Sequence, residues 1–202
     1  MQKFATPQPI TAELYVPAGR VRIIAGDRAE TVVNVRPSDA ANGHDVKAAA
    51  QTAVELVGGV LKVKAPKAPR LGRCGSVEIA VELPAGSAID GRGMAADFHA
   101  EGRLGGAKVH TAKGDISLGQ ADGPVSADTA QGDIHVAEAI SGVFELSTSA
   151  GQIEVGVAEG VSAGLRATTT YGTLHDHRKK FDGPVNAVDI RATTSYGDIV
   201  VR

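Results

Sequence analysis

Acidic residues recur at one place in a repeated segment of the chain, and stacked carboxylates are a possible metal site. Asp97, Asp115 and Asp133 each follow the residue where a repeat turns, and Asp198 does so near the C-terminus. Carboxylates one strand spacing apart repel each other, and a bound cation would relieve the repulsion. Other copies carry Gln or Thr there, which favours hydrogen bonding to turn N–H groups over a metal cage. We therefore expect a structural role and keep Asp97, Asp115 and Asp133 as weak metal candidates.

Histidines form a second possible metal-binding set. His99, His135 and His175 share the third position after the turn, but other residue types fill that position in the copies between them. Alternate repeats in a stack lie about 10 Å apart, too far for one zinc ion with bonds of about 2 Å. His175 and His177 are close enough in sequence to offer two ligands. They complete the weak metal candidates.

The single cysteine, Cys74, lies in a basic segment. Neighbouring arginines lower the pKa of a thiol, but no histidine is placed locally as a base, so we expect an exposed thiol. The same segment could hold phosphate or an acidic partner. Without interleaved aromatic residues it offers no stacking platform for single-stranded nucleic acid, which favours a solvated basic loop. Its cationic residues are Lys62, Lys64, Lys67, Arg70 and Arg73.

Catalytic motifs are missing from the sequence. No nucleophile with a placed base and no phosphate-binding loop occurs, and the glycine-containing segments GRGMAA and GRLGGA do not precede helices. Tyr171 and Tyr196 occupy equivalent positions in two repeats, where packing against each other is favoured over ligand binding. We expect a protein that is not an enzyme and uses no cofactor.

The repeated segment itself is TAKGDISL, at residues 111–118. Copies follow as TAQGDIHV, TSAGQIEV, TTYGTLHD and TSYGDIVV, and a degenerate copy, GMAADFHA, precedes them. The turn positions are separated by steps of 18, 18, 19, 21 and 25 residues. A short unit that recurs at a nearly fixed period indicates stacked units that share one core.

Three positions of each copy keep nearly the same residue type, and each position has a structural explanation. Alternation of apolar residues with a phase break at the glycine predicts two strands per unit, joined at a corner. The copies share an inward threonine, a turn glycine and an inward aliphatic residue: Thr111, Thr129, Thr148, Thr169 and Thr194; Gly114, Gly132, Gly151, Gly172 and Gly197; Ile116, Ile134, Ile153, Leu174 and Ile199. An antiparallel barrel is the alternative, but like residues at like places favour stacked parallel coils.

The first part of the chain reads differently. Short alternating strands separated by turns indicate a β-meander, with a Gly58–Gly59 hairpin and a short stretch of helical propensity at residues 45–53. We predict an all-β parallel β-solenoid of about six coils, with residues 1–86 as an N-terminal β-meander region capping it and residues 87–202 as the repeats. No linker-like tether separates the two, so one continuous domain is expected.

Composition limits the partners. Of 202 residues, 43% are apolar but only 3% are aromatic, which predicts a thin core of small side chains. A net charge of -2 gives no general attraction to nucleic acid or to anionic membranes. The N-terminal residues lack a basic stretch followed by an apolar one, and no apolar run reaches the roughly 20 residues that span a bilayer. We expect a cytoplasmic protein without membrane insertion.

Several segments resemble a known family. They include VRIIAGDRAETVVNVRPSDA, SVEIAVELPAGS, the TAKGDISL-type repeats and the closing DIRATTSYGDIVVR. The chain is similar over nearly its whole length to the bacterial β-strand-repeat proteins labelled "putative adhesins", a domain of unknown function of actinobacterial type. The resemblance implies a parallel β-solenoid and brings no enzymatic residues with it.

These observations together predict a non-enzymatic scaffold or adhesin-like protein. It would act through protein contacts or self-association, because the last repeat in sequence would leave an open C-terminal coil. The alternatives are a carbohydrate-binding β-solenoid and a regulatory protein of envelope stress.

Overall fold

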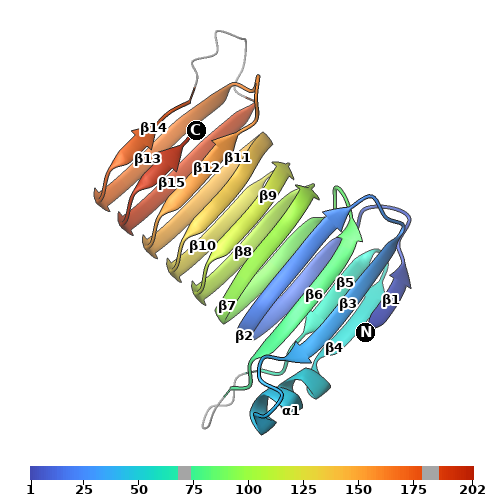
Figure 1. Cartoon of the computed structure of the whole chain (residues 1–202). Helices are drawn as coiled ribbons and strands as arrows, with labels where there is room; N and C mark the ends of the chain where they lie inside the picture. The colour runs from blue at the N-terminus through green and yellow to red at the C-terminus, as the bar shows by residue number, and fades with distance from the viewer. Residues whose placement is uncertain (68–73, 179–186) are drawn as a thin grey trace.

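The repeats form a flat stack of parallel strands that runs the length of the molecule (Figure 1). The computed structural model describes residues 1–67, 74–178 and 187–202. In each coil a first strand segment leads to a corner at the repeat glycine, and a second segment runs back from it. Neighbouring coils are hydrogen-bonded in parallel through both segments. The predicted all-β solenoid is therefore confirmed.

The strands of the coils form two layers along the stack. The first-layer strands, in spatial order, are β5 (Val60–Lys64), β2 (Thr11–Gly26), β7 (Ala88–Leu104), β8 (Gly106–Lys113), β10 (Val125–Gln131), β11 (Ile134–Ala150), β15 (Val188–Tyr196) and β13 (Ala163–Tyr171). The second layer contains β6 (Val77–Pro84), the other halves of β2, β7 and β11, and also β9 (Ile116–Asp122), β12 (Ile153–Val157), β16 (Ile199–Val201) and β14 (Leu174–Asp176).

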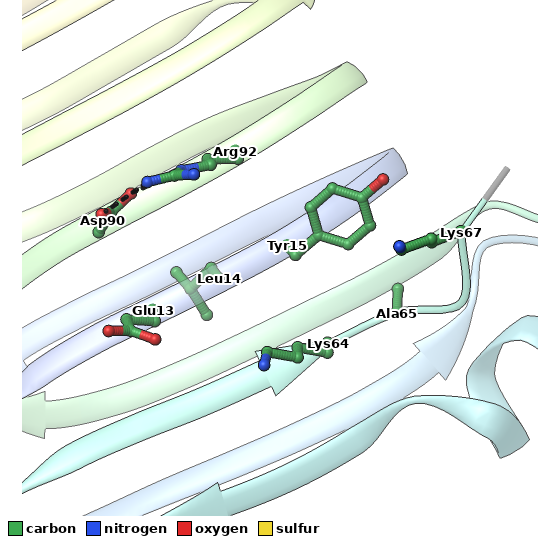
Figure 2. A pocket seen from close by; sticks show the side chains of 8 residues that line it. All are labelled: Glu13, Leu14, Tyr15, Lys64, Ala65, Lys67, Asp90 and Arg92. Atoms are coloured by element: carbon green, nitrogen blue, oxygen red, sulfur yellow. Dashed lines mark hydrogen bonds and ion pairs between the residues drawn. The ribbon is translucent and has the colours of Figure 1, made fainter.

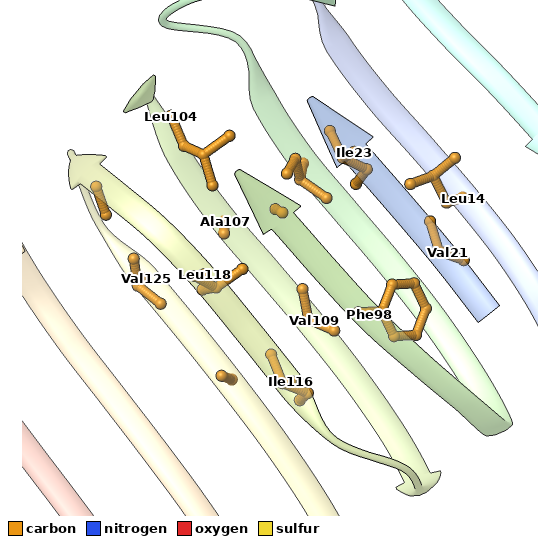
Figure 3. Close-up of a cluster of buried hydrophobic side chains, with 14 of the residues drawn as sticks. Leu14, Val21, Ile23, Phe98, Leu104, Ala107, Val109, Ile116, Leu118 and Val125 are labelled. Atoms are coloured by element: carbon orange, nitrogen blue, oxygen red, sulfur yellow. The ribbon is translucent and has the colours of Figure 1, made fainter. Parts of the chain in front are cut away.

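The core lies between these layers and is as thin as the composition predicts. Small and aliphatic side chains from successive coils meet face to face, as Figure 3 shows around Phe98, Ile116 and Leu118. Phe98 and Phe144 are the large exceptions, and both are buried. A Cβ on Gly91 would lie 2.7 Å from the ring of Phe98, so a glycine makes room for this phenylalanine. The apolar alternation is thus used for packing between layers.

The parallel stack begins earlier in the chain than the repeats suggested. β2 pairs in parallel with β7 along its whole length and places Gly19 opposite Ala96. Its PAG segment is therefore the corner of a further coil, formed by residues assigned to the meander. Residues on both sides of position 86 belong to one hydrogen-bonded sheet.

Strand pairing changes from parallel to antiparallel at the N-terminal end of the stack. β3 (Glu30–Pro37) pairs antiparallel with β6, and β1 (Gln2–Ala5) pairs antiparallel with β3. β4 (Ala53–Val57) forms the predicted hairpin with β5 through Gly58 and Gly59. The antiparallel part of the meander prediction is therefore seen, but β2 does not pair with β3, because both layers of β2 are occupied by parallel neighbours.

One short helix, α1 (Gly43–Gln51), packs against β3 and β6 at this end. Asn42 caps it by accepting a hydrogen bond from the His44 N–H. The buried Asp45 carboxylate accepts hydrogen bonds from the N–H groups of Ser76, at 2.9 Å, and Asp39, at 3.1 Å, and so ties the helix to the adjoining loops. No helix in the described part of the chain has the length and apolar character to cross a membrane.

The last two coils are stacked in the reverse of their sequence order. The C-terminal coil (β15 and β16) lies between the coil of β11 and β12 and the coil of β13 and β14. The expected open C-terminal coil is therefore wrong, because β15 and β16 have a parallel partner on each side. The open end belongs to β13 and β14, which we call the end coil.

The reversal explains the longer repeat steps. After β12 the chain must pass over one empty place in the stack before it forms β13. After β14 it must return to fill that place. Both connections need extra residues, and the two longest steps, 21 and 25 residues, occur there.

Candidate functional site

The corners carry the residues that first suggested chemistry, and their geometry is set by the backbone. Gly132 has φ +147°, and a Cβ there would lie 2.1 Å from the carbonyl oxygen of Gly114 in the neighbouring coil. Such a distance excludes any side chain unless the coils move apart. The glycine is needed because one coil's backbone passes directly over that of the next.

The threonines that recur in the repeats form hydrogen bonds from one coil to the next. Each Thr Oγ1 donates to a corner carbonyl of the neighbouring coil: Thr111 to Ala96, Thr129 to Gly114, Thr148 to Gly132, Thr194 to Gly151 and Thr169 to Gly197. Four of these threonines are buried, while Thr169 of the end coil is half-buried. The hydroxyl thus satisfies a carbonyl at the corner.

The aspartates form a second ladder of bonds along the same corners. The Oδ1 of Asp97 accepts a hydrogen bond from the Asp115 N–H at 3.2 Å, and Asp115 does the same for Asp133 at 2.9 Å. Asp133 accepts from the Gln152 N–H at 2.7 Å, and Asp198 accepts from the Thr173 N–H at 2.7 Å. Each carboxylate is therefore compensated by an N–H of the next coil, and a cation is not required to hold the row together.

A groove of about 460 Å³ runs along these corners. It is lined by Asp97, Asp115, Lys113 and Gln131, together with backbone of the corners. Lys113 places a positive charge beside the two carboxylates, which opposes cation binding. In the described ranges, no three His, Cys, Asp or Glu side chains are grouped so that they could hold a metal ion.

Replacing Asp115 tests the capping role. Asp115→Ala removes the acceptor for the Asp133 N–H, and we expect the free energy of unfolding to fall by about 1 kcal/mol. Asp115→Asn keeps a side-chain oxygen and should cost less than half of that. Urea denaturation of both variants measures the difference. A rise in Tm with millimolar calcium that Asp115→Ala abolishes would indicate a cation site instead.

His99 and His110 are paired with carboxylates on the surface, whereas His175 and His177 stack on each other. His99 Nε2 lies 2.9 Å from Glu101, His110 Nδ1 lies 2.7 Å from Asp128, and the ring centroids of His175 and His177 are 6.2 Å apart. Hydrogen bonds from His99 and Arg22 lower the pKa of the Glu101 carboxyl. The contacts of His99 and His110 are surface pairs with carboxylates, which contribute little to stability.

The other candidate residues from the sequence, Cys74 and the two tyrosines, lie in different parts of the molecule. Cys74 is half-buried beside the helix end of the stack, while Arg70 and Arg73 lie outside the described residues. Tyr171 and Tyr196 stack with ring centroids 4.9 Å apart and planes inclined by 8°, and both are exposed. The tyrosines therefore pack as predicted, and they join the end coil to the C-terminal coil.

Sequence reasoning missed the end coil, whose inward positions face solvent. Leu174 was expected to point inward like its equivalents, but it is 44% exposed, while Ile116, Ile134, Ile153 and Ile199 are buried. Ala163, Leu165 and Ala167 of β13 are only half-buried against the core. Two signals were available. Thr173 replaces the aspartate that would need a further coil to bond, and Asp176 occupies an inward position that is apolar elsewhere.

The fold and the corners together define a two-layered parallel β-solenoid with a polar corner ladder. A family model described as Toastrack DUF4097 matches residues 95–202, just over half of the chain. The chain belongs to this family. The comparison with curated proteins gave no match.

One solved structure shows the same fold over nearly the whole length. A "putative cell adhesion protein" from Clostridium sporogenes superposes with a TM-score of 0.51 at 9% identity, covering 99% of this chain and 97% of that one. A "putative adhesin" from Bacteroides fragilis gives 0.44 at 10% identity, with coverage of 100% and 95%. At such identities the likeness concerns the fold alone.

Proposed function

We propose that this protein is a non-enzymatic, adhesin-like scaffold that self-associates through its end coil. The observation that carries the proposal is that, within the described residues, β13 and β14 pair with strands on one side only, β15 and β16. Arg178 donates a hydrogen bond to the Ala163 carbonyl, but no described strand pairs with the other edges, which lie beside partly exposed apolar side chains and form a template for another strand. The names of the solved neighbours, which refer to adhesion, agree with a role in contact between molecules.

A second copy of the chain is the occupant that fits this end. The opposite end of the stack ends in the antiparallel strands β4 and β1, with α1 packed on β3 and β6, so it offers no parallel coil for head-to-tail stacking. Two end coils can instead meet about a twofold axis, with β13 antiparallel to its copy. A pairing centred on Ala167 places Arg166 opposite the partner's Thr168, so no like charges face each other.

The end coil carries an ion pair that a dimer would cover. Asp176 sits at an inward position and pairs with Arg178 at 2.6 Å. The hydrogen bonds from Arg178 lower the pKa of the Asp176 carboxyl, so this side chain stays charged near neutral pH. Because Arg178 compensates this charge within the same copy, two facing end coils need not leave it unpaired. The twofold pairing uses the open edge of both copies, so a closed dimer is favoured over a fibre.

Leu174→Lys tests the assembly with little risk to the fold. The native side chain is already exposed at the open edge, and a lysine there adds a charge that two facing coils would have to bury. Light scattering over a concentration series should show a dimer for the unmodified protein and a monomer for the variant. Ile24→Lys is the matched control, because Ile24 is similarly exposed on β2, far from the end coil. This control should remain dimeric.

A strict monomer at the highest soluble concentration would contradict the proposal, as would equal dimerisation of Leu174→Lys.

Cytoplasmic location, the lack of enzymatic activity and the actinobacterial type remain parts of the prediction. Cell fractionation with an antibody against the chain tests the location.

A further inference from the structure

A cavity on the outer face of the first layer has no role in the stack or in the proposed assembly. It measures about 400 Å³ and lies over β2, β5 and β7, near the N-terminal end of the stack (Figure 2). Its volume falls in the range of small-ligand sites, roughly 300–1,000 Å³. Its lining residues are Glu13, Leu14, Tyr15, Lys64, Ala65, Lys67, Asp90 and Arg92.

Strand pairing explains how these residues come together. In parallel register, Tyr15 of β2 lies between Lys64 of β5 and Arg92 of β7. Two residues before Tyr15, on the same face of β2, Glu13 lies next to Asp90. The cavity therefore combines an aromatic ring, flanking cations and a row of carboxylates. The sequence did not reveal it, because the lysines were read as part of a loop and Tyr15 as part of a distant strand.

Some charged side chains of the cavity have an ion-pair partner among the described residues, and others do not. Arg92 is held by Asp90, with Nε 3.3 Å from the carboxylate oxygen. Among the ion pairs of the described residues, none involves Lys64, Lys67 or Glu13. Lys64 and Lys67 are exposed, and both side chains lie on the same side of the Tyr15 ring in Figure 2. The site thus offers two free ammonium groups beside one aromatic face.

Tyr15 also differs from the other tyrosines. Tyr171 and Tyr196 use their faces on each other, whereas no ring contact involves Tyr15 among the described residues. Its ring is half-buried and borders a cavity, a common arrangement for stacking on a flat, partly apolar ligand. A single ring in an open pocket of this size suits one or two sugar units better than a strand of nucleic acid, which needs a row of rings.

We propose that this cavity binds a saccharide carrying a carboxylate, of the uronic-acid type. The apolar face of a sugar ring would stack on Tyr15, and its carboxylate would lie between the ammonium groups of Lys64 and Lys67. Glu13 and Asp90 would accept hydrogen bonds from ring hydroxyls. The binding is non-covalent, so no bond is formed or broken. The site is independent of the end coil, which lies at the other end of the stack.

A titration followed by NMR, with a glucuronic acid–N-acetylglucosamine tetrasaccharide as the probe, tests this site. We expect saturable shifts at Tyr15 and its neighbours with a Kd of the order of 1 mM or tighter. A tetrasaccharide of N-acetylglucosamine alone should bind at least tenfold more weakly, because it lacks the carboxylate. Absence of shifts at about 10 mM of the acidic probe, or equal binding of the neutral one, would overturn the proposal.

Variants separate stacking from charge. Tyr15→Ala and the double change Lys64→Glu with Lys67→Glu should each weaken binding at least tenfold, while Tyr15→Phe should keep it within threefold. Lys47→Glu is the matched charge control, because Lys47 is exposed on α1 and does not line the cavity, and it should stay within twofold. Unchanged binding by Tyr15→Ala, or displacement of the probe by equimolar inorganic sulfate, would show a bare anion site and overturn the assignment. The proposed dimer should persist in all these variants.

Discussion

Ile190→Ala is expected to lower the free energy of unfolding by about 2–5 kcal/mol, whereas Leu165→Ala should cost less than about 1 kcal/mol. The two residues are direct partners in the stack. Ile190 is fully buried between Phe144 and Leu165, so its truncation leaves a cavity in the core. Leu165 is half-buried at the open end, where solvent already reaches it.

Urea denaturation of the two variants measures this difference. The comparison controls for the layer and for the number of carbon atoms removed, because the two residues are register partners and both changes shorten a four-carbon side chain to a methyl group. If the coils were stacked in sequence order, the C-terminal coil would be the open one and the inequality would reverse. A larger cost for Leu165→Ala than for Ile190→Ala would therefore contradict the structure.

Gly132→Ala is expected to destabilise the protein by about 3 kcal/mol, although it adds a single methyl group. Alanine is strained at φ +147°, and its Cβ would lie 2.1 Å from a carbonyl oxygen and 2.6 Å from a carbonyl carbon of Gly114. Both atoms are backbone, so the clash can be relieved only by moving one coil away from the next. That movement would also weaken the Thr148 and Asp115 bonds at the same corner.

Gly26→Ala is the control for this change. Gly26 ends β2, where no atom lies within 4 Å of an added Cβ and φ is not in the left-handed region. We expect its stability to stay within about 0.5 kcal/mol of the unmodified protein, as for other surface changes. Thermal unfolding of the pair measures the effect. A Gly132→Ala protein as stable as Gly26→Ala would show that the coils are not in close backbone contact at the corners.

Most of the architecture could be predicted because single residues at fixed positions of each repeat determine how the coils pack. An inward threonine, a glycine and an inward isoleucine recur at fixed offsets, and each has one physical use at a corner. The same regularity led to the wrong order for the last two coils. Residues 163–176 and 188–201 share the threonine, glycine and aliphatic positions of the pattern, so those three positions cannot decide which segment lies outside.

The information that decides the order lies in the departures from the pattern. Asp176 and Thr173 tolerate the open end, while Val201 and Asp198 need a neighbour on each side. The cavity around Tyr15 was hidden for a different reason. Its residues come from three strands whose pairing is parallel and not sequential, and alternation within one strand carries no information about such neighbours.

Cysteine cross-linking tests the inserted C-terminal coil most directly. Ser147 and Thr193 are register partners on adjacent strands, while Thr168 lies one strand further away. In a Cys74→Ser background, the pair Ser147→Cys with Thr193→Cys should form a disulfide under mild oxidation, because adjacent strands lie about 4.8 Å apart. The pair Ser147→Cys with Thr168→Cys should not, because that separation is about twice as large. The opposite outcome, with a 147–168 disulfide and no 147–193 disulfide, would mean that the coils stack in sequence order.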